Sequence, residues 1–257
     1  MSIALTATLG IAAGSHAALY GAYKDSPHES FLPRRVVREL TFAACAALGL
    51  AVLHLGDTQT PFVLYLSVFA LSRIITEFWK LFLRVEPQGD YRIPTQIHGM
   101  GRVIHNRAAR LALGVGFVAA IYGLGRLFQL ITVGWPAWAS GLVFGGGIGL
   151  VMAMSGAYKD GMIEGFYLRK FLKSPVFGAI AGLLASVHTS SPLFLLLCAI
   201  GGERMINELL FKVLVKGYVP GKFRSMAGPF EQWWVLRRYF LPPYAATWAL
   251  GIALFFA

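Results

Sequence analysis

A short charged motif occurs twice in the chain, and its residue types could bind a metal ion. The motif is Lys-Asp-x-x-x-Glu, with copies at Lys24/Asp25/Glu29 and Lys159/Asp160/Glu164. Residues four apart share one face of a helix, so the two carboxylates of each copy can act together. Carboxylate oxygens are ligands for Mg²⁺, which commonly bridges to phosphate. We expect either a magnesium site at Asp25, Glu29, Asp160 and Glu164 or, as the alternative, charge pairing with neighbouring Lys and Arg.

A second charged pattern also occurs twice, inside apolar segments. Its copies are Arg73/Glu77/Lys80 and Arg204/Glu208/Lys212. Charged side chains inside membrane helices are costly and normally face a cavity or a partner. Because Arg binds phosphate and carboxylate through paired hydrogen bonds, the pattern predicts binding of an anionic group, with Lys24 and Lys159 contributing. The alternative is an Arg–Glu pair within each helix, four residues apart, near the membrane interface.

These two patterns belong to an internal duplication. Residues 21–38 and 156–173 align without a gap and share eight identities in 18 positions. Pro61 and Pro192 each follow a short polar turn and begin the segment that carries the second pattern. Internal repeats of this kind indicate two similar structural units. The sequence predicts one repeat over residues 1–133 and a second over residues 134–257.

The composition indicates an integral membrane protein. Of the 257 residues, 56% are hydrophobic and 14% are charged, and the mean hydropathy is +0.61. A soluble protein has about 25% charged residues. Cys45 and Cys198 both lie in apolar segments, away from any paired-cysteine pattern, which indicates neither a disulfide nor a cysteine metal site.

The hydropathy pattern predicts an all-α fold with about eight transmembrane helices, four in each repeat. A helix that crosses about 30 Å of hydrocarbon needs about 20 apolar residues. We expect the helices near residues 3–22, 37–55, 61–82, 109–132, 137–157, 174–189, 192–214 and 241–257. Four helices per repeat place both repeats in the same orientation, as in transporters with parallel repeats.

The distribution of basic residues predicts the orientation of these helices. The net charge is +11, and 22 of the 23 Lys and Arg fall at or near the loops after the first, third, fifth and seventh expected helices. Cytoplasmic loops carry such an excess of Lys and Arg. The sequence therefore predicts a cytoplasmic (inner) membrane protein with both termini outside and a basic cytoplasmic face.

Two long basic segments are expected to lie on the membrane surface. They run from 84 to 110 and from 212 to 238, and the second contains Trp233 and Trp234. Clustered Lys and Arg beside membrane helices bind anionic headgroups, and Trp prefers the interface. Membrane lipids are thus the expected partners and nucleic acid is not. Partners in an oligomer or a complex stay open.

The layout of the acidic motifs resembles that of intramembrane prenyltransferases of the UbiA type. Those enzymes carry two acidic motifs on cytoplasmic loops four helices apart, as Asp25/Glu29 and Asp160/Glu164 are expected to lie here. The resemblance implies magnesium and the diphosphate of a prenyl donor. The present chain lacks the Asn and the third acidic residue of that signature, and a ninth helix.

Three functions are compatible with these observations. The first is a transporter or channel-like protein whose charged cytoplasmic vestibule takes a small anionic or phosphate-bearing solute or a lipid headgroup. The second is an intramembrane enzyme that acts on a lipid phosphate or diphosphate. The third is a non-catalytic membrane subunit. The charges retained in both repeats favour the first, because alternating access moves one repeat against the other.

Overall fold

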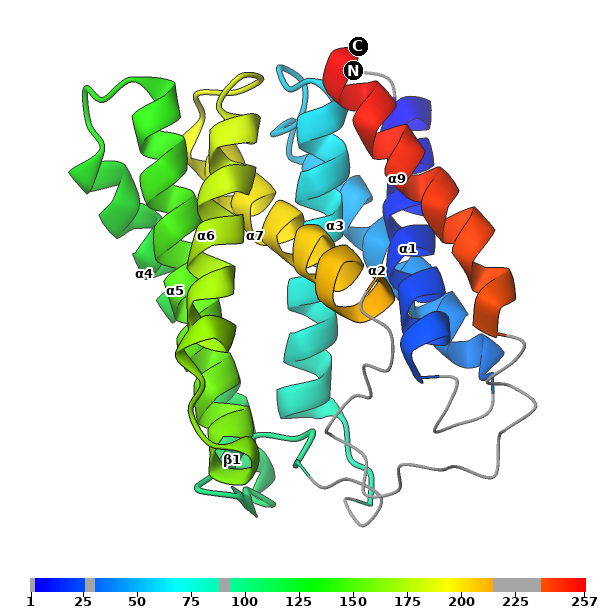
Figure 1. Ribbon diagram of the computed structural model, residues 1–257, viewed down its shortest axis with the longest axis vertical. Helices are drawn as coiled ribbons and strands as arrows, with labels where there is room; N and C mark the ends of the chain where they lie inside the picture. Colours follow the sequence, from blue (N-terminus) through cyan, green and yellow to red (C-terminus); the bar gives the residue numbers. More distant parts are fainter. Residues whose placement is uncertain (1–2, 26–30, 88–92, 215–236) are drawn as a thin grey trace. The chain divides into compact units, whose positions relative to one another are not determined.

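The computed structural model describes residues 3–25, 31–87, 93–214 and 237–257, and most of these residues are helical (Figure 1). The all-α prediction is therefore confirmed. Within these ranges, four helical segments are long and apolar enough to cross a membrane: Pro61–Leu83, Arg107–Ile131, Ala137–Lys159 and Arg238–Phe256. We treat the protein as membrane-spanning on this basis.

The helices follow the expected order. Those up to residue 131 are α1 (Ile3–Asp25), α2 (Pro33–Val52), α3 (Pro61–Phe78) with the π-helical segment η1 (Trp79–Leu83), and α4 (Arg107–Ile131). A two-stranded hairpin, β1 (His98–Gly99) and β2 (Arg102–Val103), precedes α4. Then follow α5 (Ala137–Glu164), α6 (Leu168–Ala185), α7 (Pro192–Glu208) with the π-helical segment η2 (Leu209–Val213), the 3₁₀ turn η3 (Arg237–Phe240) and α9 (Leu241–Phe256).

Two helices begin earlier than predicted. The expected starts at 37 and 174 were wrong, because α2 begins at Pro33 and α6 at Leu168. Proline is favoured in the first turn of a helix, where its missing N–H is not needed. The long stems of Arg and Lys can lie along apolar surface while their charges reach water, so a helix can continue past its apolar stretch. The basic residues at 34–38 and 169–173 consequently lie within helices rather than in loops.

The described residues form two compact units. Unit 1 holds the described residues up to Ile75 and those from Glu208 onward. Unit 2 holds Thr76–Asn207. α3 therefore begins in unit 1 and ends in unit 2, and α7 does the reverse. The division of the sequence into repeats at 133/134 concerns duplication rather than packing, and it stays a prediction.

In unit 1, α3 forms the centre of the core. Its residues 62–70 are all buried, as expected for a helix that is apolar on every side. α1 packs closely on α2, since a β-carbon at Gly14 would meet the backbone of Glu39 and Leu40. α9 lies alongside α1 (Figure 1), and Gly251 of α9 approaches the ring of Tyr65.

In unit 2, α5 and α6 are in close contact through small residues. A β-carbon at Gly141 or Gly145 would overlap the carbonyl of Gly182 or Gly178 on α6. Small residues let membrane helices approach closely enough for backbone contact. α4 presents apolar side chains such as Val115 and Leu130 outward, as a lipid-facing helix does.

Candidate functional site

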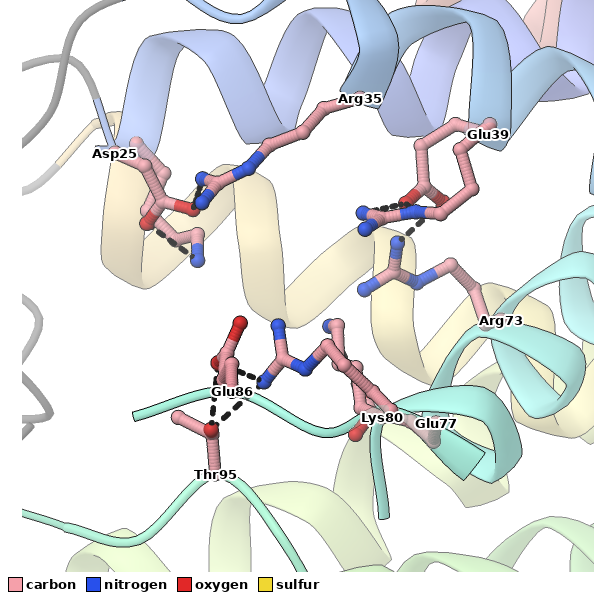
Figure 2. A network of polar contacts seen from close by, with 11 residues as sticks. Asp25, Arg35, Glu39, Arg73, Glu77, Lys80, Glu86 and Thr95 are labelled. Atoms are coloured by element: carbon pink, nitrogen blue, oxygen red, sulfur yellow. Dashed lines mark hydrogen bonds and ion pairs between the residues drawn. The ribbon is translucent and has the colours of Figure 1, made fainter. Parts of the chain in front are cut away.

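A buried carboxylate in unit 1 is shared by two arginines. Glu39 lies in α2, and its side chain is only 7% exposed. Arg73 of α3 donates from Nη1 to Glu39 Oε2 at 3.3 Å, and Arg38 donates from Nη2 to Oε1 at 2.7 Å. Figure 2 shows the Arg73 side chain pointing toward Glu39. Two guanidiniums therefore converge on one buried carboxylate.

The same two-to-one arrangement recurs at the end of α1. Lys24 Nζ lies 2.8 Å from Asp25 Oδ1, and Arg35 Nη1 of α2 lies 4.0 Å from Asp25 Oδ2 (Figure 2). The Asp25 side chain is 15% exposed, so both ion pairs are partly shielded from water. The α1–α2 pair thus carries two groups of charged side chains in which two cations pair with one carboxylate.

A polar cluster lies deeper in unit 1, around the middle of α1. His16 is fully buried, and its Nδ1 lies 2.8 Å from Thr247 Oγ1 of α9 and 3.5 Å from the Tyr65 hydroxyl of α3. The rings of Phe69, Tyr244 and Trp248 pack around the imidazole, with centroids 4.8–5.9 Å away. Three helices therefore meet at one ionisable side chain, and we refer to His16, Tyr65, Tyr244 and Thr247 as the histidine cluster.

Glu208 and Arg73 are the charged residues whose electrostatic influence reaches His16. Glu208 is 1% exposed and belongs to unit 1, at the end of α7. A buried carboxylate stabilises a nearby imidazolium, whereas a guanidinium destabilises it. Arg73 thus links the histidine cluster electrostatically to the Glu39 carboxylate, with which it is paired.

In unit 2, charged side chains near the end of α3 pair with one another, and one arginine bonds to backbone carbonyls there. Lys80 of η1 pairs with Glu77 at 3.2 Å, and Arg84 pairs with Glu86 at 2.6 Å and donates to Thr95 at 2.7 Å (Figure 2). Arg110 of α4 donates to the carbonyls of Leu81 and Arg84. The end of a helix leaves carbonyls without helical partners, and these bonds satisfy them.

The hairpin of unit 2 is held by an aromatic pair. Tyr158 of α5 donates to the His98 carbonyl at 3.3 Å, accepts from the Met100 N–H at 3.1 Å and stacks on the imidazole at 5.7 Å. Burial lowers the pKa of His98 from its ordinary value of 6.5, and the Lys159 ammonium lowers it further. His98 therefore favours the neutral form in which it stacks on Tyr158.

The structure brings together only some of the predicted site residues. Arg73 and Glu208 belong to unit 1, whereas Glu77, Lys80, Lys159 and Arg204 belong to unit 2. Glu29 and the side chains of Asp160, Glu164 and Lys212 lie outside the described residues. Within the described part of the chain, no three His, Cys, Asp or Glu side chains form a group that could hold a metal. Three of the four proposed magnesium ligands are not in that part, so the magnesium site stays a prediction.

Two important residues were not found by sequence reasoning. Glu39 lies within the apolar helix α2, and a carboxylate in such a segment is the sequence signal that could have identified it. His16 has no sequence signal of its own, because its partner Thr247 is 231 positions away in the sequence. No protein-family model, curated protein or solved structure matches the chain.

Proposed function

We propose that the protein is a membrane transporter for a small anion or a phosphate-bearing group, which it binds at Arg73 and Arg38. The observation that carries the proposal is the sharing of the buried Glu39 carboxylate by these two arginines. Arg binds phosphate and carboxylate through paired hydrogen bonds, so two guanidiniums that converge at one buried place are suited to hold such a group.

The setting of the cluster favours transport over simple charge pairing at the surface. Arg73 lies in a helix that is apolar enough to cross a membrane, and its side chain is 13% exposed. Ionisable residues within membrane helices are rare and commonly mark the path of a substrate or ion. The proposed binding site lies on the cytoplasmic side in the predicted orientation, near Lys24 and Arg35 of the same unit.

The finer architecture of the proposal is eight transmembrane helices in two parallel repeats, with both termini outside. Among the described residues, each half has two helices and then a helix that begins at proline and continues as a π-helical segment: α3 with η1, and α7 with η2. Each compact unit combines the first three helices of one half with the last helix of the other. Two similar units are what an alternating-access transporter uses.

The test is flux through liposomes that contain the purified full chain. We expect uptake of ³²P-labelled inorganic phosphate or flipping of fluorescent phosphatidic acid, and the two assays distinguish a free anion from a lipid headgroup. Arg73→Gln should reduce the active process about tenfold or more, since a charge-assisted pair of bonds to phosphate is lost. Arg126→Gln is the matched control, because Arg126 is exposed on α4 and pairs with Gln129 at 2.7 Å.

Loss of flux in Arg73→Gln with normal flux in Arg126→Gln supports the proposal. Wild-type liposomes that move neither phosphate nor phosphatidic acid, although the protein is folded and inserted, contradict it. Equal flux in wild type and Arg73→Gln places the binding site elsewhere and also contradicts the proposal as stated.

A second candidate is an intramembrane enzyme that acts on a lipid phosphate or diphosphate. The observation that favours it is Asp25, which lies at the end of α1 beside the cations Lys24 and Arg35. With magnesium held by the acidic motifs, these cations could bind the phosphate groups of a lipid. Native mass spectrometry discriminates: an enzyme should retain a lipid phosphate only with magnesium, and lose it in Asp25→Asn combined with Asp160→Asn. Retention of no ligand in either condition would favour a non-catalytic subunit.

A further inference from the structure

The hydrogen-bond donors around His16 determine which of its nitrogens carries the proton. The Thr247 hydroxyl donates its only hydrogen to the Tyr244 carbonyl at 2.7 Å, and the Tyr65 hydroxyl donates to the Thr247 carbonyl at 3.3 Å. Each hydroxyl has a single hydrogen. With Nδ1 as the donor, the 2.8 Å contact to Thr247 Oγ1 and both hydroxyl-to-carbonyl bonds form together, which favours the tautomer that carries its hydrogen on Nδ1.

This assignment leaves a basic nitrogen inside the helix bundle. With the hydrogen on Nδ1, Nε2 of a neutral imidazole has a lone pair and no hydrogen. Nε2 is buried and has no hydrogen-bond partner among the described residues. Native proteins satisfy nearly all buried polar atoms, so an exception of this kind needs an explanation. A proton that binds and leaves during function is such an explanation.

We propose that His16 Nε2 is a proton-binding site whose occupancy is coupled to anion binding at Arg73, so that the protein transports its anion together with a proton. The inference rests on the proposed function, because Arg73 is the anion-binding residue. The charged and titratable groups that face or influence His16 come from every helix packed around it. They are Tyr20 of α1, Tyr65 and Arg73 of α3, Glu208 of α7 and Tyr244 of α9.

The coupling follows from the charges. Burial opposes a positive charge on His16 most strongly, the Glu208 carboxylate favours one, and the Arg73 guanidinium opposes one. An anion bound to Arg73 cancels much of the opposing charge, so protonation of His16 becomes easier. Because binding linkage is reciprocal, protonation of His16 must strengthen anion binding by the same factor. Couplings of this kind are typically about 5-fold to 150-fold.

The corresponding position in the second half supports a specialised role. At the same spacing of 135 residues that relates the charged motifs, His16 is matched by Val151 and Glu39 by Ser174. The corresponding helices of the second half therefore form without an ionisable side chain at either position. A buried histidine and a buried carboxylate that the helical architecture does not need are expected to serve function.

The experiment measures sulfate binding to the purified full chain by calorimetry at pH 5.5 and pH 8. Sulfate keeps the same charge across this range, whereas phosphate does not, so any pH dependence comes from the protein. We expect wild-type binding to be about fivefold or more tighter at pH 5.5, with net proton uptake seen from buffers of different ionisation enthalpy. His16→Gln should bind sulfate with nearly pH-independent affinity. His54→Gln is the control, since His54 is exposed in the turn after α2, and it should behave as wild type.

Each outcome separates the two proposals. Sulfate that binds neither wild type nor any variant overturns the anion site itself. Binding with the same pH dependence in wild type and His16→Gln overturns the proton site alone. If His16→Gln fails to fold, ¹⁵N-histidine NMR of wild type decides. A resonance with Nδ1 protonated and Nε2 bare at pH 8, which gains a proton at low pH, supports the inference; an Nε2–H tautomer at pH 8 overturns it.

Discussion

The Glu39 carboxylate compensates two guanidiniums, so its removal should be costly for the fold. We expect Glu39→Gln to lower the free energy of unfolding by about 2 to 3 kcal/mol, because Arg73 and Arg38 each lose a charge-assisted bond in a poorly solvated place. Chemical denaturation in mild detergent measures the loss. Asp57→Asn is the control: Asp57 pairs with His54 on the exposed turn after α2, and its loss should leave stability unchanged within error. A Glu39→Gln protein as stable as wild type would contradict the assignment of this ion pair as buried.

The environment of His98 makes the attachment of the hairpin pH-dependent. Because folding lowers the pKa of His98, the unfolded hairpin binds a proton more tightly than the folded one. The stabilisation is fully present above the ordinary pKa of about 6.5 and is lost progressively as the pH falls below it. NMR titration of the His98 ring should show a midpoint below 6.5, and Lys159→Gln should raise that midpoint. Lys170→Gln, which removes a cation from α6, should leave it in place; an equal response to both variants would exclude a local effect of Lys159.

Residue identity was easier to predict than residue pairing. The charges at Arg73 and Glu77 were recognised from their place in an apolar segment, and a pair within the helix was one interpretation. The structure shows Arg73 bonded to Glu39 and Glu77 bonded to Lys80. Such pairs depend on which helices pack together and on their rotation. A single sequence contains no direct information on helix packing or helix rotation. For the same reason, the contact of His16 with Thr247 could not be predicted.

At the scale of helices, the contact between α5 and α6 should depend on single methyl groups. Gly145→Ala places a β-carbon against the Gly178 carbonyl, so the helices must separate. Gly146 has no atom within 4 Å of an added β-carbon, and Gly146→Ala should stabilise the protein by up to about 1 kcal/mol through helix propensity. Thermal unfolding in detergent should therefore shift in opposite directions for the two variants. A higher melting temperature for Gly145→Ala would show that the helices are not in backbone contact.

Helix existence was predictable, whereas helix ends and irregular turns were not. Apolar length alone located α3, α4, α5, α7 and α9 to within a few residues, apart from the cytoplasmic extension of α5 to Glu164. The π-helical segments η1 and η2 have no signature in hydropathy, because they differ from an α-helix only in hydrogen bonding: Arg84 N–H to Trp79 O and Leu214 N–H to Leu209 O. Such segments often occur at functional sites in helices. Lys80 and Lys212, both proposed substrate ligands, lie within them.

For the whole molecule, the two compact units differ from the two halves of the predicted duplication. Among the described residues, α4 belongs with α5, α6 and most of α7, and α9 belongs with α1, α2 and most of α3. If the halves are repeats, each contributes its last helix to the unit of the other. Separate expression of residues 1–133 would then yield a fragment that lacks α9 and its contacts with His16 and Tyr65.

The orientation of the chain yields a prediction that tests helix number and direction together. In a background of Cys45→Ala and Cys198→Ala, single cysteines are placed at exposed turns: Thr58→Cys after α2, Met100→Cys in the hairpin and Val133→Cys after α4. If both termini are outside and every predicted helix spans, Thr58→Cys and Val133→Cys lie outside and Met100→Cys lies in the cytoplasm. A membrane-impermeant maleimide should then label the first two in intact cells and the third only in inverted vesicles.

A predicted transmembrane helix lies between each labelled position and the next, so the side on which each is labelled shows whether that helix crosses the membrane. Labelling of Thr58→Cys and Met100→Cys from the same side would show that α3 does not cross the membrane. Labelling of all three on the sides opposite to those expected would preserve the crossings of α3 and α4 and reverse their direction. In that case the basic residues at 34–38 and 169–173 would face outward, against the usual preference of Lys and Arg for the cytoplasm, and Arg73 would bind its anion from the external side.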